Sequence, residues 1–138
     1  MGVKKLLAAG LTTAFAVVSA AIGSSSPAIA GDVGPAGTAY GCGYPQVCFY
    51  KTQANWTARD WTAAYQDITG SYQNLSSGAY GSYYVYNSRN DDGALLHYTN
   101  GYTYCLHPST YVNNSTNPTG FWTVDKIRIM DSPTCYRS

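Results

Sequence analysis

The stretch Ser82-Tyr-Tyr-Val-Tyr-Asn-Ser-Arg-Asn-Asp-Asp-Gly-Ala-Leu-Leu-His-Tyr98 carries the clearest fold signal in the chain. Two aromatic or apolar runs, each as long as a short strand, flank a polar segment in which Asp92-Gly93 favours left-handed turn conformations. Tyrosine and valine suit pleated strands better than helices. The stretch therefore predicts two consecutive antiparallel strands joined as a hairpin.

Similar short runs recur between turn clusters along the rest of the chain, and a second turn is expected at Asn100-Gly101. Residues 57–65 also show the three- and four-residue apolar spacing of a helix, and residues 113–120 read as a polar loop. The number and spacing of the strand-like runs predict an all-β antiparallel sandwich. These runs are residues 47–51, 61–68, 82–87, 94–99, 102–106 and 126–130.

The first 30 residues read as a cleavable export signal. Lys4 and Lys5 precede an apolar run at residues 6–22, and Ala28-Ile29-Ala30 supplies the small-x-small pattern of a cleavage site. A retained membrane anchor is the alternative, although glycine, threonine and serine dilute the run. We expect a secreted chain with a Gly/Pro-rich flexible leader at residues 31–41 and one domain at residues 42–138.

Charge argues against two classes of partner. Removing Lys4 and Lys5 from the eight basic residues leaves six against seven aspartates, a net charge of about −1. Such a chain has no electrostatic attraction for nucleic acid or for anionic lipid. We therefore expect a monomer that binds neither nucleic acid nor, after processing, a membrane.

The four cysteines all follow the export signal, and an even count in an oxidising compartment indicates two disulfides. Four cysteines allow three pairings. We favour Cys42 with Cys48, which are close in sequence, and Cys105 with Cys135, which would tie a late strand to the C-terminus. Zinc is the weaker alternative, because the spacing of Cys42 and Cys48 is too wide for a zinc knuckle.

The sequence offers little to an enzyme. Glutamate is absent, so a pair of catalytic carboxylates would need aspartates such as Asp91-Asp92, whose position ahead of Gly93 is typical of a turn. His97 and His107 are the only histidines, and neither belongs to a zinc-hydrolase or Gly-x-Ser-x-Gly motif. We expect no catalytic residue, no metal and no cofactor.

Several segments resemble the βγ-crystallin-like peptidase inhibitor family of secreted bacterial proteins. The resemblance rests on Val47-Cys48-Phe49-Tyr50-Lys51, then Trp56, then residues 78–87 and the late strand Asp125-Lys126-Ile127-Arg128-Ile129. It implies a sandwich of two Greek-key motifs and inhibition of an extracellular peptidase, with thermolysin-like metalloproteases the family's best-known targets. The calcium motif of crystallins has lost its Asn/Asp pair here, so no calcium dependence is expected.

Two groups of residues are candidates for binding. Inhibitors present a rigid loop, and a disulfide at Cys105 together with Pro108 would stiffen the segment Tyr104-Cys105-Leu106-His107-Pro108. The resemblance implies that Cys105-Leu106 is the pseudo-scissile bond, with Leu106 filling the primed-side pocket. The alternative is an ordinary strand end followed by a turn at Pro108.

The second group is a set of tyrosines. Strand alternation places Tyr84 and Tyr86 on one face, so with Tyr98 they would form an exposed aromatic surface unless a second layer covers them. Such a surface suits a protein or a sugar. Besides a peptidase inhibitor, a killer-toxin-like or antimicrobial protein of the same fold and a carbohydrate- or cell-wall-binding module stay open.

Overall fold

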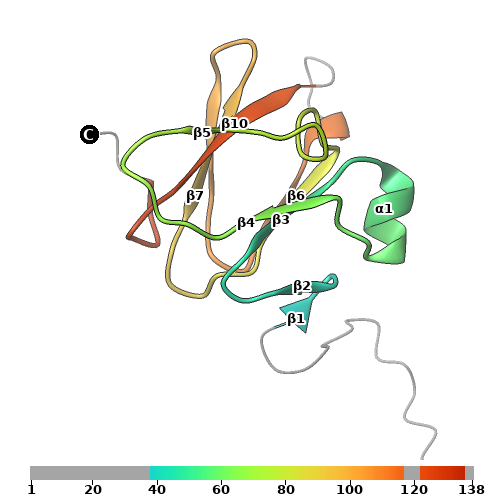
Figure 1. Cartoon of the computed structure of the whole chain (residues 1–138), viewed down its shortest axis with the longest axis horizontal. Helices are drawn as coiled ribbons and strands as arrows, with labels where there is room; N and C mark the ends of the chain where they lie inside the picture. Colours follow the sequence, from blue (N-terminus) through green and yellow to red (C-terminus); the bar gives the residue numbers. More distant parts are fainter. Residues whose placement is uncertain (1–37, 117–121, 136–138) are drawn as a thin grey trace, which may run out of the picture.

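Two four-stranded antiparallel sheets make up most of the computed structural model, which describes residues 38–116 and 122–135 (Figure 1). The first sheet has the order β4-β3-β6-β9, with bounds Ala63–Tyr65, Val47–Tyr50, Tyr84–Asn87 and Tyr111–Asn113. The second has the order β5-β10-β7-β8, with bounds Gln73–Asn74, Val124–Ile129, Ala94–Tyr98 and Thr103–Leu106. The expected all-β class is confirmed.

The two sheets exchange strands. In the unit β3 to β6, the first, second and fourth strands lie together in one sheet, and the third, β5, pairs with β10 of the other. The unit β7 to β10 repeats the pattern, because its third strand, β9, pairs with β6. The chain therefore crosses repeatedly from one sheet to the other.

The main core lies between the sheets because alternate residues of both sheets point inward. Phe49 and Val85 from the first sheet meet Leu96 and Ile127 from the second, and all four are fully buried. Tyr98 joins them, with its hydroxyl donating to Oδ1 of buried Asn114 at 2.8 Å. Asn114 begins the short 3-10 helix Asn114–Thr116, and Asn113 ends a strand. The prediction of a loop at residues 113–120 is therefore wrong for residues 113–116, and residues 117–120 lie outside the described residues.

A second layer covers the outer face of the first sheet. It consists of the hairpin β1 (Thr38–Ala39) and β2 (Cys42–Gly43) together with the helix α1 (Gln53–Ala58). Trp56 on α1 stacks on Tyr84 at 4.6 Å between ring centroids and on Tyr40 at 4.5 Å. The predicted flexible leader at residues 31–41 is wrong for residues 38–41, which belong to this hairpin. Residues 31–37 and the predicted export signal lie outside the described residues.

Both favoured disulfides are present. Cys42 bonds to Cys48 beneath the N-terminal hairpin, and Cys105 on β8 bonds to Cys135 near the C-terminus. Two disulfides indicate an extracellular or otherwise oxidising environment.

The predicted hairpin at residues 82–98 is wrong. The strands β6 and β7 do follow one another in the sequence, but they lie in different sheets. Residues 88–93 carry the chain from one sheet to the other. Buried Asn87 fixes this crossing, because its side chain donates to the carbonyls of Asp92 and Leu106. The turn expected at Asn100-Gly101 is confirmed, with Gly101 at a φ of 84° between β7 and β8.

The helix lies earlier than expected, at Gln53–Ala58 instead of residues 57–65. Thr52 caps it, because its hydroxyl accepts from the backbone N–H of Asn55 while the Asn55 side chain accepts from that of Thr52. Arg59 ends it in the left-handed region. No helix among the described residues is long and apolar enough to span a membrane.

Candidate functional site

Leu106, the expected pocket-filling residue, is 0% exposed. It pairs with Ala94 across β7 and β8, and the two side chains face the core together. His107 to Thr110 then form a turn, in which the Thr110 hydroxyl donates to the His107 carbonyl at 2.7 Å and Ser109 has a φ of 58°. The prediction that Leu106 enters a protease pocket is therefore wrong for this conformation, and the strand end followed by a turn is what the chain adopts.

The other members of that segment do not form an extended loop either. Tyr104 lies exposed on β8, Cys105 is held by its disulfide, and exposed His107 contacts the Pro133 carbonyl through Nδ1 at 3.3 Å. Pro108 is half-buried within the turn. The segment is rigid, but its backbone does not present a row of side chains to a partner.

The expected aromatic surface of Tyr84, Tyr86 and Tyr98 is wrong because all three are buried. Tyr84 and Tyr86 do share a face, as strand alternation predicts, but α1 and the N-terminal hairpin cover it. Tyr98 points the other way into the inter-sheet core. Exposed aromatic rings are found elsewhere, at Tyr44, Trp61, Tyr80, Tyr83, Tyr102, Tyr104 and Tyr111.

The crossing from β4 to β5, residues 66–72, is the better candidate for a binding segment, and we call it the Ile68 segment. Ile68 leaves 48% of its surface exposed, although it is a large apolar residue. Its backbone nevertheless forms a parallel β-bridge with Ile129, and the Thr69 N–H donates to the Ile129 carbonyl at 3.3 Å. Ile68 is thus held in an extended conformation with its side chain toward solvent.

Three side chains from the body of the domain hold carbonyls on both sides of Ile68. Arg89 donates from a terminal nitrogen to the Gln66 carbonyl at 3.2 Å, and Gln73 donates from Nε2 to the Asp67 carbonyl at 3.3 Å. On the other side, Arg128 donates from Nε to the Thr69 carbonyl at 3.3 Å. These bonds fix the backbone of the segment before any partner arrives.

Arg89 also organises the neighbouring loop. It is only 5% exposed, and its Nε and a terminal nitrogen donate to Oδ2 of buried Asp92 at 2.9 and 2.5 Å. A further bond runs to the Pro45 carbonyl at 2.9 Å. The ring of Tyr44 lies over the guanidinium at 5.8 Å, and the Tyr44 hydroxyl donates to Asp91 at 3.0 Å. This hydrogen bond to the carboxylate of Asp91 and its negative charge raise the pKa of Tyr44.

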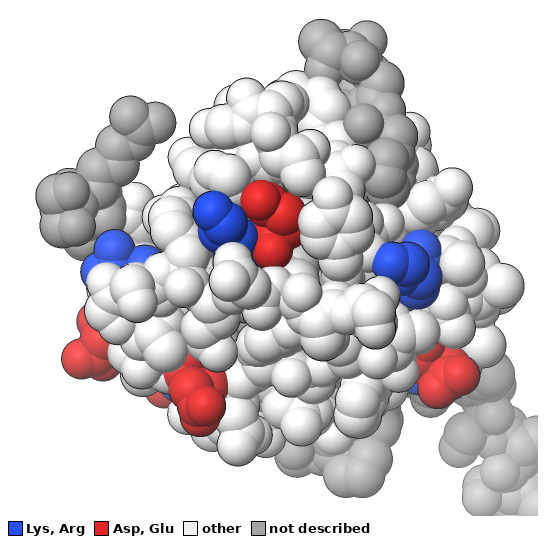
Figure 2. All heavy atoms as spheres, turned by 45° about the horizontal axis from the view of Figure 1, so that its top comes forward, with Lys and Arg blue, Asp and Glu red and all other residues white. Residues whose placement is uncertain are grey.

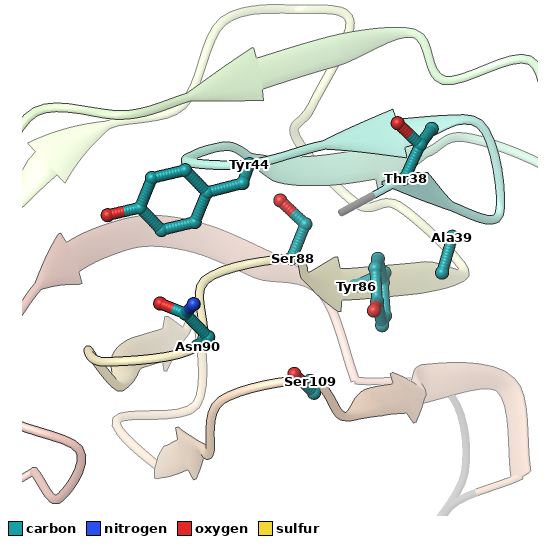
Figure 3. A pocket seen from close by; sticks show the side chains of 7 residues that line it. All are labelled: Thr38, Ala39, Tyr44, Tyr86, Ser88, Asn90 and Ser109. Atoms are coloured by element: carbon teal, nitrogen blue, oxygen red, sulfur yellow. The ribbon is translucent and has the colours of Figure 1, made fainter. Parts of the chain in front are cut away.

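Two hollows open next to these loops. One, of about 460 Å³, lies against residues 66 and 67 of the Ile68 segment, and its lining is mostly polar: Gln46, Ala64, Tyr65, Gln66, Asp67 and Gln73. The other, of about 160 Å³, lies between the N-terminal hairpin, residues 86–90 and Ser109 (Figure 3). Both therefore lie beside loops that Arg89 holds in place.

A β-bulge on β10 creates the one histidine–carboxylate pair found among the described residues. The register shifts between Val124 and Lys126, so that Asp125 reaches Nδ1 of His97 with Oδ1 at 2.6 Å. The pair is partly buried on the outer face of the second sheet beside Tyr72. In the described ranges no group of three or more metal-binding side chains comes together.

Charge is sparse on the surface. Figure 2 shows a few basic and acidic side chains, one of each lying next to the other near the centre, with broad uncharged areas between them on the face it presents. Recognition through such a face depends on shape, apolar contact and hydrogen bonding more than on charge steering.

The sequence pattern does not single out the Ile68 segment, because residues 61–68 together predict one strand. The useful signal was the single isoleucine in Gln66-Asp67-Ile68-Thr69-Gly70, an apolar residue among polar ones directly after a strand. Two of the three donors that hold the segment, Arg89 and Arg128, are far away in sequence, so no local pattern points to them.

No protein-family model matches this chain, and neither the curated proteins nor the solved structures contain a significant match.

Proposed function

We propose that the chain is a secreted inhibitor of an extracellular peptidase, and that it offers the Ile68 segment to the enzyme. The observation that carries the proposal is the combination of an exposed isoleucine with carbonyls held on both sides by Arg89, Gln73 and Arg128. Peptidases bind their substrates as extended chains, and a chain already fixed in that form loses little entropy on binding.

Rigidity also separates an inhibitor from a substrate. The hydrogen bonds on either side of Ile68 would keep both ends of a cut bond in place, which favours rejoining over release. Because the segment joins two strands of different sheets, its ends cannot move apart without disturbing the core. The segment therefore fits an inhibitor that occupies the active site and leaves slowly.

The fold supports the resemblance to the βγ-crystallin-like inhibitor family. Two successive four-strand units exchange their third strands, an arrangement we interpret as a pair of interlocked Greek-key motifs. The family's activity against thermolysin-like enzymes suggests a pocket for a bulky apolar residue just after the scissile bond. Asp67-Ile68 would then be the pseudo-scissile bond, in place of Cys105-Leu106.

The test is a titration of purified protein against thermolysin-, subtilisin- and papain-type peptidases. Inhibition of at least one at micromolar concentration is expected, and inhibition of none would remove the proposal. Ile68→Ala should then weaken inhibition about 30-fold, from a loss of roughly 2 kcal/mol in an apolar pocket.

Tyr104→Ala is the matched control, because Tyr104 is an exposed large side chain outside the segment. It should leave the inhibition constant unchanged. Equal inhibition by wild type and Ile68→Ala would show that another surface contacts the enzyme.

A further inference from the structure

The hollow in Figure 3 is small, and more of its lining surface is apolar than polar. Its volume of about 160 Å³ is that of about five waters at 30 Å³ each, well below the 300–1,000 Å³ of drug-sized pockets. The lining residues come from three separate parts of the chain that meet here: Thr38, Ala39, Tyr44, Tyr86, Ser88, Asn90 and Ser109. None of the seven is charged, so the hollow suits a small neutral molecule.

Two polar side-chain groups of the lining have no hydrogen-bond partner among the described residues. They are the side-chain amide of Asn90 and the hydroxyl of Tyr86. Tyr86 is only 6% exposed. Its ring is fixed by an edge contact with Tyr40 at 4.9 Å, and burial raises the pKa of its hydroxyl, which stays a neutral donor. A polar ligand in the hollow would satisfy these groups without displacing a protein contact.

Tyr44 supplies an aromatic wall. One face of its ring lies over the Arg89 guanidinium, and its hydroxyl is bonded to Asp91, so the ring is oriented without a ligand. Nearly half of the residue, 49%, is exposed. Aromatic rings of this kind stack on the apolar face of a flat partner while hydroxyl and amide groups bind its polar edge.

We propose that this hollow binds one neutral pyranose unit of a carbohydrate. A pyranose has an apolar C–H face and a rim of hydroxyls, which matches the Tyr44 ring and the unpartnered groups of Tyr86 and Asn90. The site does not depend on peptidase inhibition, since the hollow does not include the Ile68 segment. A protein with both sites would be held on a polysaccharide or a glycosylated surface while its other segment engages an enzyme.

The experiment is an NMR titration of the folded protein with two probes, methyl β-D-glucopyranoside and methyl N-acetyl-β-D-glucosaminide. A Kd on the order of 1 mM is expected for a ligand of this size, with saturable shifts at Asn90, Ser109 and neighbouring amides. If neither glycoside causes saturable shifts at concentrations up to about 50 mM, the proposal is overturned.

Matched variants locate the site. Tyr86→Phe and Asn90→Ala remove groups that bond to no described residue, so the fold should be retained and affinity should fall about three- to tenfold in each. Tyr104→Phe removes an exposed hydroxyl outside the hollow and should change nothing. Equal affinity of wild type and Tyr86→Phe for both glycosides would refute the assignment of the hollow.

Discussion

Replacing Arg89 by methionine tests whether one side chain holds the loops of this domain together. Arg89 and Asp92 are each 5% exposed and bond to one another, and Arg89 also donates to the carbonyls of Pro45 and Gln66. Methionine keeps much of the volume but leaves the Asp92 carboxylate buried without its cation. Breaking a buried pair in this way costs about 3 to 5 kcal/mol of unfolding free energy.

Urea denaturation followed by tryptophan fluorescence measures that loss. The double variant Arg89→Met/Asp92→Leu should be less destabilised than the sum of its single variants, because it removes the unpaired charge along with its partner. Lys126→Met is the control, since Lys126 lies on β10 and makes no ion pair with any described residue, and it should change stability by less than about 0.5 kcal/mol. A loss below about 1 kcal/mol for Arg89→Met, or strictly additive single variants, would refute the reasoning.

Removing the Cys105–Cys135 disulfide by serine substitution should lower the unfolding free energy by about 3.6 kcal/mol in the chain-entropy model, because the bond closes a separation of 30 residues. The urea midpoint of the double serine variant reports this, and an unchanged midpoint would contradict it. Alkaline pH should also destabilise the fold. Burial raises the pKa of Tyr50 and Tyr98 above the ordinary value of 10, so their contribution is complete below pH 10 and is lost as the pH rises beyond it. The test follows tyrosinate absorbance and unfolding together as the pH is raised. If all the tyrosines, Tyr50 and Tyr98 included, ionise while the protein is still folded, the prediction is wrong.

Much of the secondary structure follows from local pattern. The strands β3, β6, β7 and β8 lie within the predicted runs because each is a short segment rich in aromatic and apolar residues, and β3 and β6 are buried on both faces. The strands β5 and β9 were missed because they are two and three residues long, with polar residues such as Gln73 and Asn113 that carry no alternation signal. Their positions are set by pairing with strands distant in sequence.

Which strands pair is where the sequence reasoning failed. Asp92-Gly93 is a turn signal, but a turn signal does not distinguish a hairpin from a crossing between sheets. At position 93 a Cβ would lie 3.1 Å from the Pro133 carbonyl oxygen and 3.2 Å from the Cys135 sulfur, so any larger residue would crowd the C-terminal segment. Leu106 was misjudged for a related reason: an apolar residue after a cysteine says nothing about which face it takes until its pairing with Ala94 is known.

The strand exchange brings several loops of this domain together, so that they hydrogen-bond to one another. Because β5 and β9 each leave their own unit for the opposite sheet, residues 66–72 and 107–110 cross between sheets, and residues 88–93 also cross, from β6 to β7. Arg89 lies on the crossing at residues 88–93. Its guanidinium donates a hydrogen bond to the Gln66 carbonyl on the crossing at residues 66–72, and its own carbonyl accepts one from the Ser109 N–H, on the crossing at residues 107–110, at 3.0 Å. One residue thus links three of the crossings between the sheets, and the inhibitory segment and the sugar-binding hollow that we propose both lie beside it. It follows that Arg89→Met should weaken peptidase inhibition without contacting the enzyme, and that the loss should be smaller than for Ile68→Ala, because Gln73 and Arg128 still hold their carbonyls.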